Sequence, residues 1–319
     1  MGGLETLIGA LGLSFVSGIN LYAAVLVVGL GLRYGWFPFL PEQLQVLSDP
    51  WVIGIAGTFY LLEFFADKVP FVNTVWDGIH TFIRPVGAAL MALGAAEELG
   101  PAAQVIAMLV GGSVALGTHS TKAGFRLLAN TAPEPATHSV ISVAEDVGVV
   151  GLLALVYTYP VPALVLLVVL LALMAYITPL IFRTLRFLVG SVGSAVFGWA
   201  DSASDSPAER PGWVQAELEG GPTWRVYKGY ARSVSGAPVL SIGYLAVSDL
   251  DSYFVRKGWL GVKSLRLGSP TRDVRAGVLC DIVEFDSDNR VCLTKKWARL
   301  YRERFGGPEP ADSVAATAL

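Results

Sequence analysis

The sequence predicts a mainly α-helical membrane protein with a small β-rich domain in its C-terminal third. The 319 residues are 53% hydrophobic and only 15% charged, with a mean hydropathy of +0.56, whereas soluble domains carry about 25% charged residues. Apolar runs fill residues 4–190, with sparse charges between them. From residue 201 onward the composition is that of an ordinary soluble domain.

Six segments are candidates for transmembrane helices, because a helix needs about 20 mostly apolar residues to cross the hydrocarbon core. The second segment is short and depends on interfacial aromatic residues such as Trp51. An even number of spans predicts that both termini lie on one side of the membrane. The six spans are Leu4–Arg33, Trp51–Ala66, Ile79–Ala96, Ala102–Ala129, Val140–Tyr157 and Val161–Phe187.

The distribution of basic residues predicts which side this is, because Lys and Arg concentrate on the cytoplasmic side of helix ends. We therefore expect both termini, and the soluble domain, in the cytoplasm of a bacterium whose plasma membrane holds the helices. The inner ends would carry Lys68, Arg84, Lys122, Arg126, Arg183 and Arg186, and the outer ends Arg33, Asp49, Glu97 and Glu98.

The first and fourth spans are unusually long, and polar residues interrupt each of them. Ser17–Asn20 interrupts the first and Gly117–Ser120 the fourth, and an offset of 99 residues pairs Asn20 with His119. We therefore predict two inverted three-helix repeats, residues 1–100 and 101–190, whose broken helices meet near the midplane as in many secondary transporters. The alternative is that these small residues only let helices pack closely.

Nine residues around the two interruptions form the predicted substrate site. The half-helices that follow the breaks would present free N–H groups and positive dipole ends, which favour anions. A histidine and two basic residues nearby favour a small anionic solute. The residues are Ser17, Gly18, Asn20, Gly117, Thr118, His119, Ser120, Lys122 and Arg126.

Acidic residues and a histidine inside the spans are candidates for ion or proton coupling, because ionisable groups in a bilayer are expensive and usually functional. Spacings of three, four and seven residues place several of them on shared helix faces. The alternative is a structural ion-pair network, with Lys68, Arg84 and Arg126 reaching lipid phosphate. The coupling candidates are Glu63, Asp67, Asp77, His80, Glu145 and Asp146.

The predicted function is therefore a transporter or channel-like protein for a small, anionic solute, coupled to H⁺ or Na⁺. The alternative is a lipid-handling or scaffolding membrane protein with a regulatory cytoplasmic domain. A membrane enzyme ranks last, because no nucleophile or metal-ligand spacing supports one. We expect no cofactor, no metal and, with a net charge of −3, no nucleic-acid partner; the partners are the bilayer and a solute or ion, and homo-oligomerisation is left open.

Several motifs resemble an uncharacterised bacterial multipass membrane family, domain of unknown function 4126. The resemblance covers residues 5–190 and supports the membrane fold without adding a function. The motifs are Ser17-Gly-Ile-Asn20, Glu63-Phe-Phe-Ala-Asp-Lys-Val-Pro70, Val75-Trp-Asp-Gly-Ile-His-Thr-Phe-Ile-Arg-Pro85, Thr118-His-Ser-Thr-Lys-Ala-Gly124, Asn130-Thr-Ala-Pro-Glu-Pro135 and Glu145-Asp146.

The C-terminal region is predicted to be a Gly-, Ser- and Pro-rich linker (191–212), a β-rich domain (213–305) and a disordered tail (306–319). Seven β-like runs and a final helix, Lys295–Phe305, fit a pleckstrin-homology-like sandwich or another small barrel. Cys280 and Cys292 are interpreted as reduced cytoplasmic thiols. The runs are Trp213–Leu218, Thr223–Val234, Val239–Val247, Ser252–Val255, Gly261–Leu267, Val278–Glu284 and Arg290–Leu293.

Overall fold

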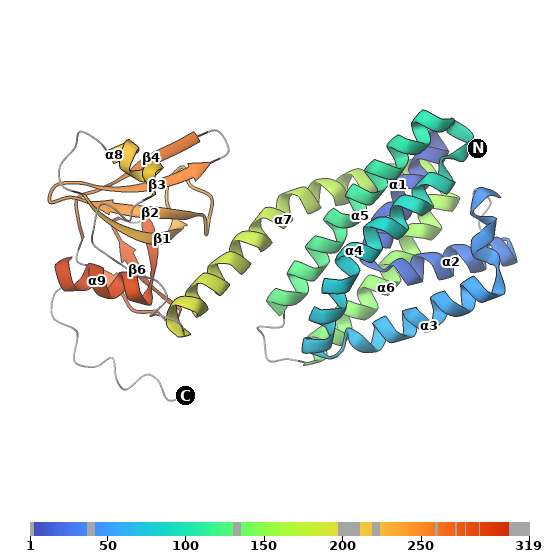
Figure 1. Cartoon of the computed structure of the whole chain (residues 1–319), viewed down its shortest axis with the longest axis horizontal. Helices are drawn as coiled ribbons and strands as arrows, with labels where there is room; N and C mark the ends of the chain where they lie inside the picture. The colour runs from blue at the N-terminus through green and yellow to red at the C-terminus, as the bar shows by residue number, and fades with distance from the viewer. Residues whose placement is uncertain are drawn as a thin grey trace. The chain divides into compact units, whose positions relative to one another are not determined.

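The computed structural model describes residues 3–36, 42–129, 135–196, 211–218, 224–258, 261–271, 273–277, 279–286 and 288–305. The chain forms two compact units, which meet within one long helix at residues 181 and 182. The first unit is helical, and the second holds an antiparallel sheet together with the last residues of that helix (Figure 1). The predicted disordered tail, 306–319, lies outside the described residues.

The helices of the first unit coincide in position with the six segments predicted as spans, except that the first segment is divided into two helices. Proline occupies the first position of α3 to α7, where its missing N–H costs nothing. Three of the described helices are long and apolar enough to cross a membrane, over Pro101–Ala129, Val140–Thr158 and Pro160–Gly193. The helices are α1 (Gly3–Ile19), α2 (Leu21–Tyr34), α3 (Pro50–Ala66), α4 (Pro70–Ala95), α5 (Pro101–Ala129), α6 (Pro135–Thr158) and α7 (Pro160–Val196), with the 3-10 segments η1 (Glu42–Ser48) and η2 (Glu97–Leu99).

Helices α1 and α2 form a hairpin that enters the bundle and returns to the end from which it started. We call that end the Gly100 end, because α4 ends and α5 begins there. Gly3 at the start of α1 packs on Leu99 of η2, and Gly29 late in α2 packs on Leu47 of η1. Asn20, at the turn, is buried, and α2 runs back beside α3 (Figure 1).

The prediction of a broken fourth helix is wrong. Helix α5 runs without interruption through Gly117–Ser120. The hydroxyls of Thr118 and Thr121 donate to the carbonyls of Val114 and Gly117, one turn earlier. These side chains therefore bond within the helix, where Ser and Thr are tolerated, and a single helical glycine costs only about 1 kcal/mol.

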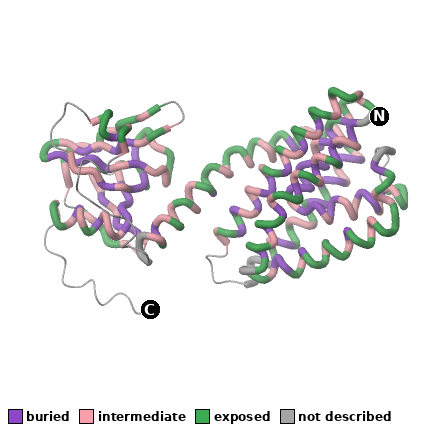
Figure 2. Tube along the Cα trace, in the orientation of Figure 1, coloured by how far each residue is buried: buried purple, intermediate pink, exposed green. Residues whose placement is uncertain are grey.

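Small residues let the helices of the first unit approach closely. A Cβ added at Gly12 would lie 2.6 Å from a methyl group of Val156, and one at Gly111 would lie 2.6 Å from the Ser14 hydroxyl. Figure 2 shows the buried faces turned toward neighbouring helices and exposed faces on the outside of the bundle. Those outer faces carry large apolar side chains such as Leu109 and Val165, as expected for a surface that meets lipid.

The second unit contains a seven-stranded antiparallel sheet among its described residues, in the order β4-β3-β2-β1-β7-β6-β5. Its core includes Tyr227, Phe254 and Leu293, and Tyr301 of the terminal helix packs against it. The strands are β1 (Arg225–Ser233), β2 (Ile242–Val247), β3 (Ser252–Gly258), β4 (Gly261–Gly268), β5 (Val274–Arg275), β6 (Cys280–Glu284) and β7 (Arg290–Thr294), and the helices are α8 (Gly212–Leu218) and α9 (Lys295–Phe305).

Two local predictions for this unit are wrong. Residues 213–218 form helix α8 instead of a strand, because the amides of Val214 and Gln215 bond to the Pro211 carbonyl and start a helical turn. The predicted linker also begins too early, since α7 continues to Val196. Residues 197–210 of that linker lie outside the described residues.

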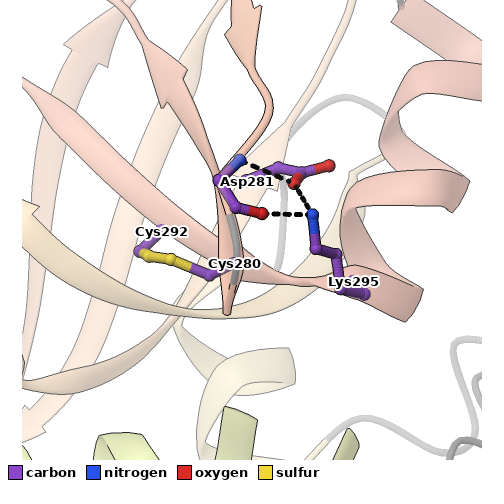
Figure 3. Close-up of a disulfide and its surroundings, with 5 residues drawn as sticks. Cys280, Asp281, Cys292 and Lys295 are labelled. Carbon is purple, nitrogen blue, oxygen red and sulfur yellow. Dashed lines mark hydrogen bonds and ion pairs between the residues drawn. A yellow bond between two sulfur atoms is a disulfide. The ribbon is translucent and has the colours of Figure 1, made fainter. Parts of the chain in front are cut away.

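The two cysteines are joined in a disulfide, which corrects the prediction of reduced thiols. Cys280 on β6 and Cys292 on β7 have Cα atoms 5.8 Å apart, and Figure 3 shows their sulfurs bonded. The pair packs against Tyr230 of β1 and Phe187 near the end of α7. Sequence spacing missed it because the pairing arises from the register of β6 against β7.

Candidate functional site

The site is centred on the break between α1 and α2. Asn20 has an extended backbone, with φ −148° and ψ 99°, and its side-chain oxygen accepts a hydrogen bond of 2.9 Å from the Ala23 amide. This is an N-cap, which satisfies one of the free amides at the start of α2. The predicted interruption of the first span is therefore real, and it falls at Asn20.

Two buried cationic side chains donate hydrogen bonds to the last carbonyls of α1. Arg84 on α4 donates to the carbonyls of Gly18 at 3.0 Å and Ile19 at 2.7 Å, and Lys122 on α5 donates to the Ile19 carbonyl at 2.6 Å. The end of a helix has unpaired carbonyls and a partial negative charge. Positive side chains therefore stabilise a helix end that lies away from water.

The same cations belong to a buried network of ion pairs. Glu63 on α3 contacts Arg84 at 2.6 Å and Lys122 at 3.3 Å, and Lys122 also lies 3.2 Å from Glu145 on α6. Arg126 bridges Glu145 and Asp67 at the end of α3. We call the following set the charged layer: Glu63, Asp67, Asp77, Arg84, His119, Lys122, Arg126, Glu145 and Asp146.

His119 is a neutral connector in the charged layer. Its Nδ1 lies 2.9 Å from the Arg84 guanidinium, and its Nε2 lies 3.0 Å from the Asp77 carbonyl oxygen. Because arginine can only donate, Nδ1 must accept, and the proton is on Nε2. The fully buried ring thus has both nitrogens engaged within the protein, and its role in solute binding stays a prediction.

Two carboxylates of the charged layer have no cationic contact among the described residues. Asp146 accepts hydrogen bonds from the Asn20 amide at 3.1 Å and the Tyr60 hydroxyl at 2.9 Å. Asp77 is only 4% exposed, and its Oδ1 has no hydrogen-bond partner in the part of the chain that the structure describes. Lys122 and Arg126 act on Asp77 only through space.

The charged layer consequently has an excess of negative charge. Its five carboxylates are Glu63, Asp67, Asp77, Glu145 and Asp146, and its three cations are Arg84, Lys122 and Arg126. If all five carboxylates were ionised, two negative charges would remain without a counter-charge. Burying an uncompensated charge is costly, and a protein avoids it by binding a proton or another cation.

The remaining predicted substrate residues serve mainly to pack the helices together, and of these Gly18 also contacts the charged layer through its backbone carbonyl, which accepts from Arg84. Gly18 allows close approach, since an added Cβ would lie 2.5 Å from the Ala115 carbonyl oxygen of α5. Gly117 packs against Met174 on α7, and Ser17 donates to the Leu13 carbonyl at 2.6 Å. Thr118 and Ser120 lie within the continuous α5.

The structure places His80 against the aromatic rings of Tyr22 and Trp76, and Arg84 in the charged layer. His80 bonds to the Trp76 carbonyl at 2.7 Å and the Tyr22 hydroxyl at 3.0 Å, outside the charged layer. Arg84 is completely buried at its centre, whereas the sequence placed it at a helix end or on lipid phosphate. The sequence signal for this position was that Arg84 lies on the same helix face as Asp77, seven residues away. Tyr60 was missed because a lone tyrosine in an apolar span carries no signal.

The fold and the charged layer define a class of helical membrane protein in which ionised side chains surround a broken helix. The chain belongs to the family described as domain of unknown function (DUF4126), whose model matches residues 7–179. The match covers the first unit up to α7, including the whole charged layer. Neither the curated proteins nor the solved structures contain a match to this chain.

Proposed function

We propose that this protein is a cation-coupled membrane transporter in which Asp77 and Asp146 bind H⁺ or Na⁺. One observation carries the proposal: the charged layer holds five carboxylates and only three cations, and the buried Asp77 and the partly buried Asp146 have no ion pair among the described residues. A bound cation would restore neutrality. Ionisable residues of this kind inside membrane helices mark ion and proton pathways.

The geometry favours a cation over the anionic solute that the sequence suggested. Arg84, Lys122 and Arg126 each contact at least one carboxylate of the protein itself. The positive end of α2 is capped by Asn20, whose amide also bonds to Asp146. The groups expected to attract an anion are thus already neutralised by the chain's own carboxylates.

The hairpin indicates where the ions would cross the helical unit. In a bilayer, non-helical backbone is tolerated only where protein or water surrounds it, and broken helices near the midplane are where many transporters bind their ions. Asn20 is such a break, and its neighbours Gly18 and Ile19 contact the charged layer directly. The ions would pass between this break and helices α3 to α6.

The hairpin also changes the proposed topology. If α1 and α2 return to the Gly100 end while α3 to α7 cross, the N-terminus and the β-rich unit lie on opposite sides. Lys68 at the other end of the bundle, with Arg183 and Arg186 late in α7, favours that side as cytoplasmic, since the Gly100 end carries Glu98. We therefore propose an external N-terminus, in place of two cytoplasmic termini.

The disulfide argues against a cytoplasmic β-rich unit, because disulfides are rare in the cytosol. We give more weight to the basic residues, since they flank the helices whose orientation is in question.

The test uses the purified full-length protein in liposomes on a solid-supported membrane, with rapid jumps in H⁺ or Na⁺ concentration. Cation binding should produce a charge movement in wild type, and the ion that evokes it identifies the coupling species. Asp77→Asn and Asp146→Asn should each abolish most of it. Asp49→Asn is the matched control, because this exposed residue caps α3 and Asn caps equally well. A silent wild type with both ions refutes the proposal.

A further inference from the structure

Among the described residues, the polar contacts of the hairpin tip come from the charged layer or from the hairpin itself. We define the tip as Gly18–Asn20. Its two free carbonyls accept from Arg84 and Lys122, and the Asn20 amide donates to Asp146. The position of the tip therefore depends on side chains whose charge balance depends on a bound cation.

Asn20 joins two functions in one amide group. Its Oδ1 caps α2 by accepting from the Ala23 amide at 2.9 Å, and its Nδ2 donates to Asp146 Oδ1 at 3.1 Å. The side chain is almost fully buried, at 2% exposure, so water does not replace either bond. A change in the charge of Asp146 is therefore transmitted directly to the start of α2.

The strength of the second bond depends on that charge. A hydrogen bond to an ionised carboxylate is roughly twice as strong as one between neutral groups. A proton or a Na⁺ on Asp146 competes for the same oxygens that hold the Asn20 amide. The tip is thus held when Asp146 is an uncompensated anion and released when a cation occupies it.

We propose that the tip is a gate and that Asn20 is the positioning residue that couples it to the occupancy of Asp146. This inference rests on the proposed function, because it takes Asp146 as a cation site. In the empty state the Asn20 bond closes the tip against α6. In the occupied state the tip moves away from Asp146 while Arg84 and Lys122 remain attached to its carbonyls.

Several groups on neighbouring helices face Asp146 and would contribute to its response to pH. Tyr60 on α3 donates to its second oxygen at 2.9 Å, and Glu63 on α3 and Lys122 on α5 act on it through space. Glu145 precedes it on α6 and pairs with Lys122 and Arg126. The test therefore compares variants at each pH and does not rely on a single titration.

The experiment measures hydrogen exchange of the tip and the first turn of α2 in the full-length protein in nanodiscs, at acidic and alkaline pH, corrected for intrinsic rates. Wild type should exchange about tenfold faster at acidic pH, the change expected when a charge-assisted bond is lost. Asp146→Asn should exchange fast at both pH values. A tip that is equally protected in Asp146→Asn and in wild type at alkaline pH refutes the inference.

Asn20→Ser separates the two roles of Asn20, because serine caps a helix as well as asparagine but has no amide to reach Asp146. It should melt like wild type and lose the pH dependence of exchange. Asn20→Thr, which also caps a helix and has no amide to reach Asp146, should do the same if Asn20→Ser unfolds. Ser17→Ala, one turn earlier, should keep the wild-type response. Retained pH dependence in the Asn20 variants overturns the gate.

The two proposals fail separately. If wild type gives charge movements that Asp146→Asn abolishes while tip exchange never responds, the gate is wrong and the transporter stands. If wild type gives no charge movement with either ion, the transporter is wrong whatever the tip does.

Discussion

The charged layer predicts opposite effects for two substitutions that each remove a buried negative charge. Glu63→Gln should destabilise the protein strongly, because Glu63 and Arg84 are both completely buried and 2.6 Å apart. Removing one partner leaves the Arg84 guanidinium without its counter-charge. Asp77→Asn should leave stability unchanged or increase it, because Asp77 has no ion pair to lose within the described residues.

The magnitudes follow from the contacts. Breaking a buried ion pair costs about 3–5 kcal/mol, and Arg84 keeps its bonds to Gly18, Ile19 and His119. In membranes the unfolded helices also find polar partners, which lowers such values. We therefore expect Glu63→Gln to cost about 3 kcal/mol, at the low end of the range. Asp77→Asn should either lower the free energy of unfolding by less than about 1 kcal/mol or raise it.

The assay is the free energy of unfolding from SDS titration of the protein in mixed micelles, followed by circular dichroism. A double-mutant cycle with Arg84→Gln isolates the pair, and its coupling energy should exceed about 1.5 kcal/mol. Asp49→Asn again serves as an exposed control, with a change within about 0.5 kcal/mol. Equal costs for Glu63→Gln and Asp77→Asn, or a coupling energy near zero, would refute the charge assignment.

Two further predictions concern packing and topology. Gly18→Ala should cost about 1–3 kcal/mol of stability from overpacking, because its Cβ would lie 2.5 Å from the Ala115 carbonyl oxygen and 2.8 Å from the Thr118 Cβ. Gly54→Ala, which has open space around it, should be neutral or slightly stabilising in the same titration. A Gly18→Ala variant as stable as wild type would contradict the close contact. Tags fused at the N-terminus and after the β-rich unit should lie on opposite sides of the membrane by protease accessibility in spheroplasts, whereas tags on the same side would contradict a hairpin that turns back.

The sequence predicted those features that depend on local pattern. Hydropathy indicates apolar helices, and a polar Asn20 preceded by Ser17 and Gly18 predicts a break that an N-cap then completes. Strands β1 to β4, β6 and β7 and the final helix Lys295–Phe305 follow from alternation and turn residues, whereas β5 was not predicted. The clustering of Glu63, Lys122, Arg126 and Glu145 was also predictable, because buried charges require partners.

Other features required three-dimensional contacts. A polar interruption breaks the helix at Asn20, whereas a similar one leaves α5 intact at Gly117–Ser120. The reason is that Arg84 and Lys122 bind the carbonyls of Gly18 and Ile19, which have no helical partner once the helix ends. The direction of α2 after the break is decided by its packing on α3 and η1, and the proposed external N-terminus depends on this direction.

The sequence by itself determined that this protein places acidic and basic groups among apolar helices, since composition and spacing are properties of the chain. Only the tertiary structure decided which of those groups neutralise one another. Glu63, Asp67 and Glu145 contact cations, whereas Asp77 and Asp146 do not in the described residues. The reason is physical: charge compensation depends on distances of a few ångströms between different helices, and no pattern along one helix specifies them.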